Sequence, residues 1–147
     1  MSTVGTCSFI GGNGKKNKEK TMGNLIPAIL LVFVIIYFVP FMIYGSLSAA
    51  GWIEQPEGSP ARFLVGILVS KLATAVVFVL IFHLALEAFG DRWLLYAFLW
   101  WIMFAVGEVG QAIGPKYSWK EALAGIISET IYFPLAAWVM WGLVGKG

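Results

Sequence analysis

Four long apolar runs, separated by short polar connections, constrain this chain more than any other feature of its sequence. Each is long enough to supply the ~20 residues with which an α-helix crosses the ~30 Å hydrocarbon core of a bilayer. β structure is excluded because lipid offers no partners to unpaired backbone amides and none of the runs alternates like a barrel strand. Short connections force successive helices to run antiparallel. We therefore predict an all-α membrane protein, an antiparallel up-down bundle of four transmembrane helices at about 25–50, 61–89, 92–113 and 119–144.

The composition agrees with a membrane protein of one domain. Only 12% of the residues are charged and the mean hydropathy is +0.82, whereas about a quarter of the residues of a soluble domain are charged. Residues 1–24 are rich in glycine and lysine and predict a flexible, basic tail, while 25–147 form the transmembrane domain. Translation could start at Met1 or at Met22. The net charge of +2 is small and the basic residues lie at segment ends, so we expect no nucleic-acid partner.

The positive charges predict the orientation of the bundle. Cytoplasmic connections of membrane proteins carry an excess of Lys and Arg. The lysines of the tail, Arg92 and Lys146 would share one side, against Arg62, Lys116 and Lys120 on the other. We therefore predict a multi-pass protein of the inner, cytoplasmic membrane with both termini in the cytoplasm.

Ionisable residues inside the apolar runs are the first candidates for function, because a charge at the bilayer centre costs about 2.5 to 3.5 kcal/mol on insertion scales. Lys71 follows Arg62 by nine residues, which places it ~14 Å below the membrane surface at a rise of ~1.5 Å per residue. Glu129 lies equally far below the same surface, and Glu108 on the antiparallel third helix lies ~12 Å below it. One ammonium and two carboxyl groups are thus predicted at one level.

Helical spacing indicates which faces point into the bundle. On the fourth helix one stripe holds small residues together with a carboxylate and a phenol, and it comprises Ala122, Gly125, Glu129, Tyr132 and Ala136. Gln111 shares a face with Glu108, and beside it Gly107, Gly110 and Gly114 form a small-residue stripe that predicts close backbone approach. From the first helix, Tyr37 and Tyr44 could reach the interior.

Three hypotheses of function remain open. A polar interior made by Lys71, Glu108, Gln111, Glu129 and Tyr132 could bind or transport a small solute, an ion or a proton. Alternatively, Lys71 neutralises Glu129 and the polar groups only fix the packing of the helices. The chain could also be a structural or assembly subunit of a larger membrane complex. Besides the lipid bilayer, the expected partners are further copies of the chain or the other subunits of such a complex.

Catalytic and metal sites have little support. His83 and Glu87 are one turn apart near the end of the second run, but metal ligation needs further ligands and the apolar runs contain neither another histidine nor a cysteine. A pair that caps the helix end is the simpler interpretation. Because no serine has a histidine within a plausible triad and no glycine-rich phosphate loop is present, we assign no catalytic residue and no cofactor.

Several short aromatic and polar segments recur at defined places in the apolar runs. The first apolar run contains Tyr37-Phe38-Val39-Pro40-Phe41 followed by Tyr44-Gly45. The third run contains Trp101 to Phe104, and Ser118-Trp119-Lys120 opens the fourth, with Glu129 and Tyr132 further on. Together these segments resemble those of small four-helix membrane proteins that are known only as a domain of unknown function. The resemblance spans most of residues 30–144 and implies a helical bundle without implying an activity.

Overall fold

The computed structural model describes residues 23–53, 60–115 and 117–146 of the chain. Of the predicted tail at 1–24, only Gly23 and Asn24 fall within these residues. The tail prediction otherwise lies outside the described residues.

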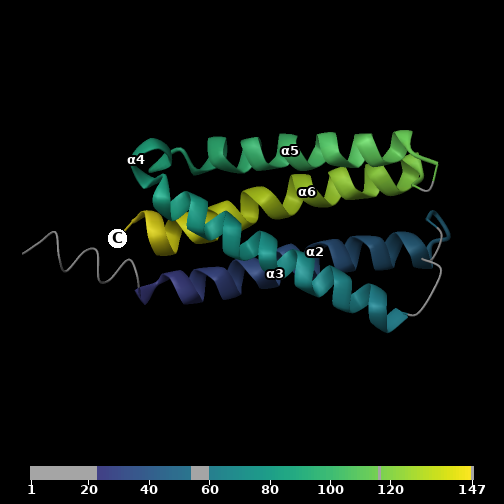
Figure 1. Ribbon diagram of the computed structural model, residues 1–147, viewed down its shortest axis with the longest axis horizontal. Helices are drawn as coiled ribbons and strands as arrows, with labels where there is room; N and C mark the ends of the chain where they lie inside the picture. Colours follow the sequence, from purple (N-terminus) through teal and green to yellow (C-terminus); the bar gives the residue numbers. More distant parts are fainter. Residues whose placement is uncertain (1–22, 54–59, 116, 147) are drawn as a thin grey trace, which may run out of the picture.

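All regular structure in the described residues is helical. The elements are α2 (Leu25–Ala49), α3 (Pro60–Leu84), α4 (Leu86–Phe89), α5 (Trp93–Ile113), α6 (Trp119–Met140) and a π-helical turn, η1 (Trp141–Gly145). The described chain has four helices that are long and apolar enough to cross a membrane. These helices pack against one another (Figure 1), which confirms the predicted class of an all-α membrane protein.

Helix α6 is the centre of the arrangement. It packs against α5 on one side and against α2 on the other (Figure 1). Half of its membrane-spanning window is buried, whereas most of the corresponding windows of α2, α3 and α5 are accessible. The stripe of small and polar residues predicted on this helix is buried as expected, from Ala122 and Gly125 through Glu129 and Tyr132 to Ala136. The buried face of α6, including Glu129 and Tyr132, therefore lies in the interior of the molecule.

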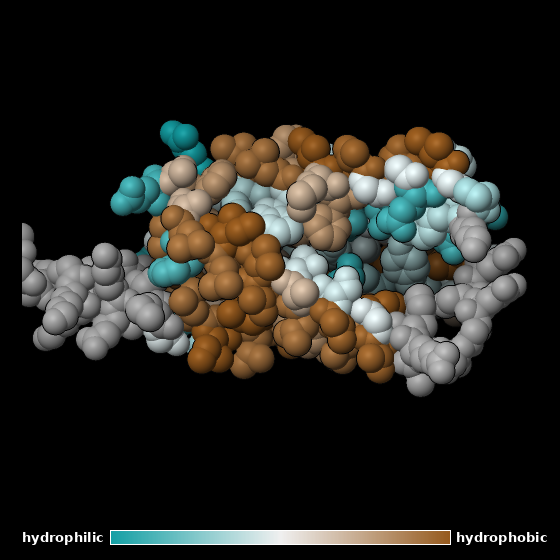
Figure 2. Space-filling view, viewed as in Figure 1, coloured by the Kyte–Doolittle hydropathy of each residue, from teal (hydrophilic) through white to brown (hydrophobic). Residues whose placement is uncertain are grey.

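Helix α3 crosses the other helices at an angle instead of lying parallel to them (Figure 1). It packs mainly on α2. Side chains in the first half of its span, such as Val65 and Val69, are exposed, whereas Phe78 and Phe82 in the second half are fully buried. Figure 2 shows hydrophilic colours gathered between α3 and α5 at the end where α3 diverges, with apolar surface on either side.

Aromatic rings fill the core at the opposite end. Phe78 and Phe82 of α3 pack on Tyr96 of α5, at ring-centroid distances of 4.9 and 5.2 Å. Phe133 of α6 lies 5.8 Å from Phe78, so the cluster joins three helices. The Tyr96 hydroxyl donates a hydrogen bond to the carbonyl oxygen of Phe78. The second half of α3 is thereby held against the bundle while its first half stands apart.

Local sequence signals account for some helix ends and not for others. α6 begins at a capping box, in which the Glu121 amide donates to Ser118 Oγ at 3.2 Å and the Ser118 amide donates to Glu121 Oε2 at 2.7 Å. By contrast, the helix expected at 61–89 is divided: α3 ends at Leu84 and the separate short helix α4 begins at Leu86. No glycine or proline marks this break, since the residue between the two helices is Ala85.

The start of α2 and the end of α6 meet at one end of the molecule (Figure 1). Asn24 Nδ2 donates a hydrogen bond of 2.9 Å to the carbonyl oxygen of Leu143 in η1. Four crossings are consistent with this contact, because an even number returns the chain to the side on which it started. The side of the membrane on which this end lies remains a prediction from the positive charges.

Candidate functional site in the membrane interior

Glu129 and Tyr132 are two buried polar residues on the inner face of α6. Glu129 is 3% exposed and Tyr132 is fully buried. Within the described residues, neither Glu129 Oε2 nor the Tyr132 hydroxyl has a hydrogen-bond partner. Residues three apart on a helix are neighbours on its surface. Two residues with unsatisfied polar groups thus share one face of α6 in the interior of the molecule.

The Glu108 carboxyl group reaches the same face of α6 from α5. A methyl group at Gly125 would lie 2.6 Å from Glu108 Cδ and 2.9 Å from each carboxyl oxygen, so only glycine leaves room for this carboxyl group. The hydroxyl of Tyr117, in the connection between α5 and α6, donates a hydrogen bond of 2.6 Å to Glu108 Oε2. This length is typical of an O–H donor on a carboxylate.

Two tyrosines extend this contact towards the membrane surface. The hydroxyl groups of Tyr44 and Tyr117 lie 3.4 Å apart, and Tyr44 also donates to the carbonyl oxygen of Glu121 at 3.2 Å. Burial of the Tyr117 ring and the hydrogen bond from its hydroxyl to Glu108 raise the pKa of Tyr117 well above its ordinary value. Tyr117 is therefore a neutral donor at physiological pH.

Lys71 approaches the site from α3. Its ammonium nitrogen lies 5.4 Å from the centre of the Tyr132 ring, within the range of a cation–π contact. Because Glu129 Oε2 has no hydrogen-bond partner among the described residues, Lys71 does not donate to that oxygen. The contact that the structure shows for Lys71 is thus with an aromatic ring.

These contacts fall on consecutive turns of α6. Glu108 contacts Gly125, Lys71 contacts Tyr132, and Glu129 lies between them. The span from residue 125 to residue 132 is ~11 Å at the helical rise. Chemically, such an arrangement can hold a proton or a small polar ligand between an unsatisfied carboxyl oxygen and a phenol.

Other residues predicted for the site lie elsewhere. Gln111 is exposed on α5, so it does not face the interior with Glu108. Tyr37 stacks on Phe33 and Phe41 of its own helix, at 5.7 and 6.4 Å. The prediction that another helix approaches closely at Gly107 and Gly110 is also wrong. A Cβ atom built at either glycine has nothing within 4 Å.

His83 and Glu87 do not form the helix-end pair that their spacing suggested. His83 is half-buried at the end of α3 and its Nδ1 atom has no partner within the described residues. Glu87 is exposed on the separate helix α4. Within the described ranges, no three His, Cys, Asp or Glu residues form a group that could hold a metal ion.

Tyr117 and Gly125 contribute to the site without having been assigned to it from the sequence. Gly125 was expected to be buried, but its contact with Glu108 depends on how α5 and α6 align across their connection. Tyr117 lies outside the apolar runs. The only sequence feature that could have indicated its role is its position just before the fourth run.

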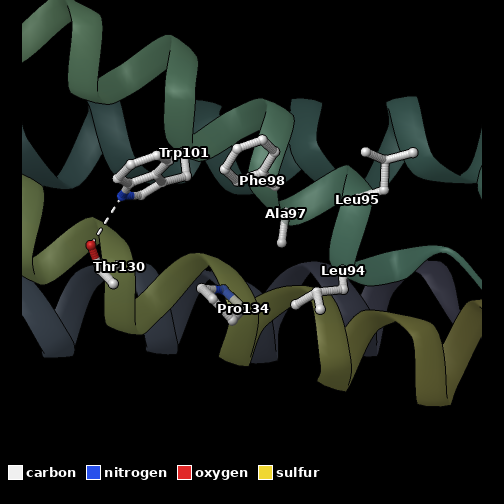
Figure 3. A pocket seen from close by; sticks show the side chains of 7 residues that line it. All are labelled: Leu94, Leu95, Ala97, Phe98, Trp101, Thr130 and Pro134. Atoms are coloured by element: carbon white, nitrogen blue, oxygen red, sulfur yellow. Dashed lines mark hydrogen bonds between the residues drawn. The ribbon is translucent and has the colours of Figure 1, made fainter.

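A groove on the molecular surface is separate from this site. It is a groove of about 440 Å³ between α5 and α6, lined by Leu94, Leu95, Ala97, Phe98, Trp101, Thr130 and Pro134 (Figure 3). Trp101 Nε1 donates to Thr130 Oγ1 at 3.0 Å, and that hydroxyl donates to the Ile126 carbonyl at 2.7 Å. Because these polar groups are paired and the remaining walls are apolar, the groove suits lipid chains and offers no charged contact.

No protein family, curated protein or solved structure matches this chain. The resemblance to a four-helix family therefore stays a prediction.

Proposed function

We propose that this multi-pass membrane protein binds or transports a small solute, an ion or a proton at Glu129 and Tyr132, with Glu108 and Lys71 beside them. One observation supports the proposal above all others: Glu129 Oε2 and the Tyr132 hydroxyl are both buried and both lack a hydrogen-bond partner among the described residues. Each such group destabilises a protein by about 1–3 kcal/mol. Two of them on the same face of one helix are better explained by a ligand that satisfies both.

The charges favour a proton or a small cation as the ligand. Two carboxyl groups, Glu108 and Glu129, accompany the single ammonium of Lys71, and the contact of Lys71 is with the Tyr132 ring. A carboxyl group in a low-dielectric interior either takes up a proton or acquires a positive partner. Ionisable residues in membrane interiors commonly serve ion and proton pathways.

A role as a structural or assembly subunit is the second candidate. Most of the spanning windows of α2, α3 and α5 are accessible, and the first half of α3 stands away from the other helices. Those surfaces could pack on further chains as well as on lipid. A binding protein should be stable alone or as a homo-oligomer, whereas an assembly subunit should co-purify with other chains and lose its structure without them.

The test compares Glu129→Gln and Lys71→Met with the wild-type chain, with Glu87→Gln as the matched control because Glu87 is exposed on α4. Each variant is purified in mild detergent, and its melting temperature is measured from pH 5 to pH 9 and in NaCl and KCl. Infrared difference spectra between the two pH values report the protonation of carboxyl groups. We expect a carboxyl band and a pH or salt response in the wild type and in Glu87→Gln, and the loss of both in Glu129→Gln.

The wild-type measurement alone can overturn the proposal, so a variant that fails to fold does not leave it untested. A wild-type chain whose melting temperature is insensitive to pH, Na⁺ and K⁺, and whose spectra lack a carboxyl band, has no binding role at Glu129. Wild-type behaviour in both Glu129→Gln and Lys71→Met would lead to the same conclusion.

A further inference from the structure

A second groove lies at the end of the molecule where α2 begins and α6 ends. It has a volume of about 290 Å³ and is lined by Leu31, Trp138, Val139, Trp141, Gly142, Leu143 and Lys146. None of these residues belongs to the site around Glu129. The groove is therefore an independent feature of the fold.

The backbone at this groove departs from a regular α-helix. From Trp141 to Gly145 the chain forms a π-helical turn, η1, and such turns occur frequently at functional sites. The Trp141 indole lies so close to the backbone of Gly145 that a Cβ atom at Gly145 would collide with it. The turn thus holds the Trp141 ring in the wall of the groove.

The groove combines apolar walls with one cation. Leu31 and Trp138 are 47% and 55% exposed. Lys146 is exposed too, and its ammonium nitrogen lies 4.1 Å from the centre of the Trp141 ring. Tryptophan rings favour the headgroup zone of a bilayer. A basic residue in that zone attracts anionic headgroups.

We infer that this groove binds an anionic phospholipid, with an acyl chain along Leu31 and Trp138 and the phosphate on Lys146. Charge complementarity selects this occupant: free phosphate would leave the apolar walls uncovered, and a zwitterionic lipid would bring no net charge to Lys146. The site is thus specific for a lipid class and does not depend on the proposed binding role of Glu129.

Lipid retention by the full chain tests this inference. The protein is exchanged into detergent with equal amounts of phosphatidylglycerol and phosphatidylcholine, and retained lipid is measured by native mass spectrometry. The wild type should retain phosphatidylglycerol preferentially. Lys146→Ala should weaken that retention about five-fold, the factor expected for one basic residue near an anionic surface. Lys120→Ala is the matched control, because Lys120 is exposed at the opposite end of α6.

A second pair of variants tests the apolar part of the groove. Both Gly142 and Gly107 are exposed and have nothing within 4 Å of a built Cβ, so the first side-chain carbon of a leucine meets open space at either position. Gly142→Leu should fill the groove and reduce retention of phosphatidylglycerol, whereas Gly107→Leu on α5 should leave it unchanged.

Several results would overturn the inference: equal retention of the two lipids by the wild type, equal effects of Lys146→Ala and Lys120→Ala, or wild-type retention in Gly142→Leu. Displacement of the bound lipid by millimolar inorganic phosphate, or a second copy of the chain in its place, would do the same. Glu129→Gln should retain lipid like the wild type, so the two proposals can fail separately.

Discussion

The backbone of Gly125 on α6 lies directly against the carboxyl group of Glu108 on α5. A Cβ atom at Gly125 would come within 2.6 Å of Glu108 Cδ. The same carboxyl group accepts a hydrogen bond from Tyr117 at 2.6 Å. The missing side chain of Gly125 therefore leaves the space that the Glu108 carboxyl group occupies between α5 and α6.

Gly125→Ala should destabilise the protein by about 1–3 kcal/mol, the usual effect of adding a methyl group to a packed interior. The methyl group must displace the Glu108 carboxyl group, and the bond from Tyr117 would be lost with it. Unfolding in sodium dodecyl sulfate measures the effect. Gly110→Ala is the control, because nothing lies within 4 Å of a built Cβ there. An unchanged stability of Gly125→Ala would show that the Glu108 carboxyl group can move aside without cost.

Tyr117→Phe should reduce the sensitivity of the protein to alkaline pH. The folded state raises the pKa of Tyr117, because burial and the bond to Glu108 favour the protonated phenol. In the unfolded chain the pKa is about 10, so this group's contribution is complete below pH ~10 and is lost as the pH rises towards the folded-state pKa. The wild type should therefore lose stability above pH ~10, and the variant should lose less.

Melting temperatures of the wild type and of Tyr117→Phe, measured from pH ~8 to pH ~11, test this expectation around the ordinary tyrosine pKa. Tyr37→Phe serves as the control, because the Tyr37 ring stacks on Phe33 and Phe41 of its own helix. If both variants retain the full alkaline loss of the wild type, the Tyr117 phenol does not contribute to it.

The sequence predicted the four helices because length and hydropathy are sufficient to identify membrane spans. It also predicted the buried face of α6, where small residues mark close packing around Glu129. On α5 the same reasoning failed for Gly107, Gly110 and Gln111. Lipid and protein interior are both apolar, so hydrophobic periodicity carries little information about which face of a membrane helix points inward.

Contacts between residues on either side of a helix connection could not be predicted from the sequence either. Tyr117 reaches Glu108 because the chain reverses between α5 and α6, and its partner depends on the relative shift of the two helices. The break between α3 and α4 at Ala85 could not be predicted, because the residue there is neither glycine nor proline. It places Glu87 on a different helix from His83, which a spacing of four residues cannot reveal.

Tyr96→Phe should destabilise the protein by about 0.5–1.5 kcal/mol, the usual contribution of one hydrogen bond. The hydroxyl donates to the carbonyl oxygen of Phe78 and links α5 to α3, while the ring packs on Phe82 and Phe89 at 5.2 Å and would stay in place. The same detergent-unfolding measurement applies. Stability equal to that of the wild type would mean that ring packing alone joins these helices.

Tyr132→Phe should have the opposite effect when no ligand is bound. The Tyr132 hydroxyl is buried and has no partner within the described residues, so its removal relieves an unsatisfied group and should raise the stability by about 1–3 kcal/mol. The ring remains, and with it the contact to Lys71. If the proposed binding is correct, the response of the melting temperature to pH or to small cations should weaken at the same time, because the variant lacks one of the two groups proposed to bind the ligand. A gain in stability without any loss of response would restrict the binding site to Glu129, and a loss of stability would show that the hydroxyl has a partner in the protein.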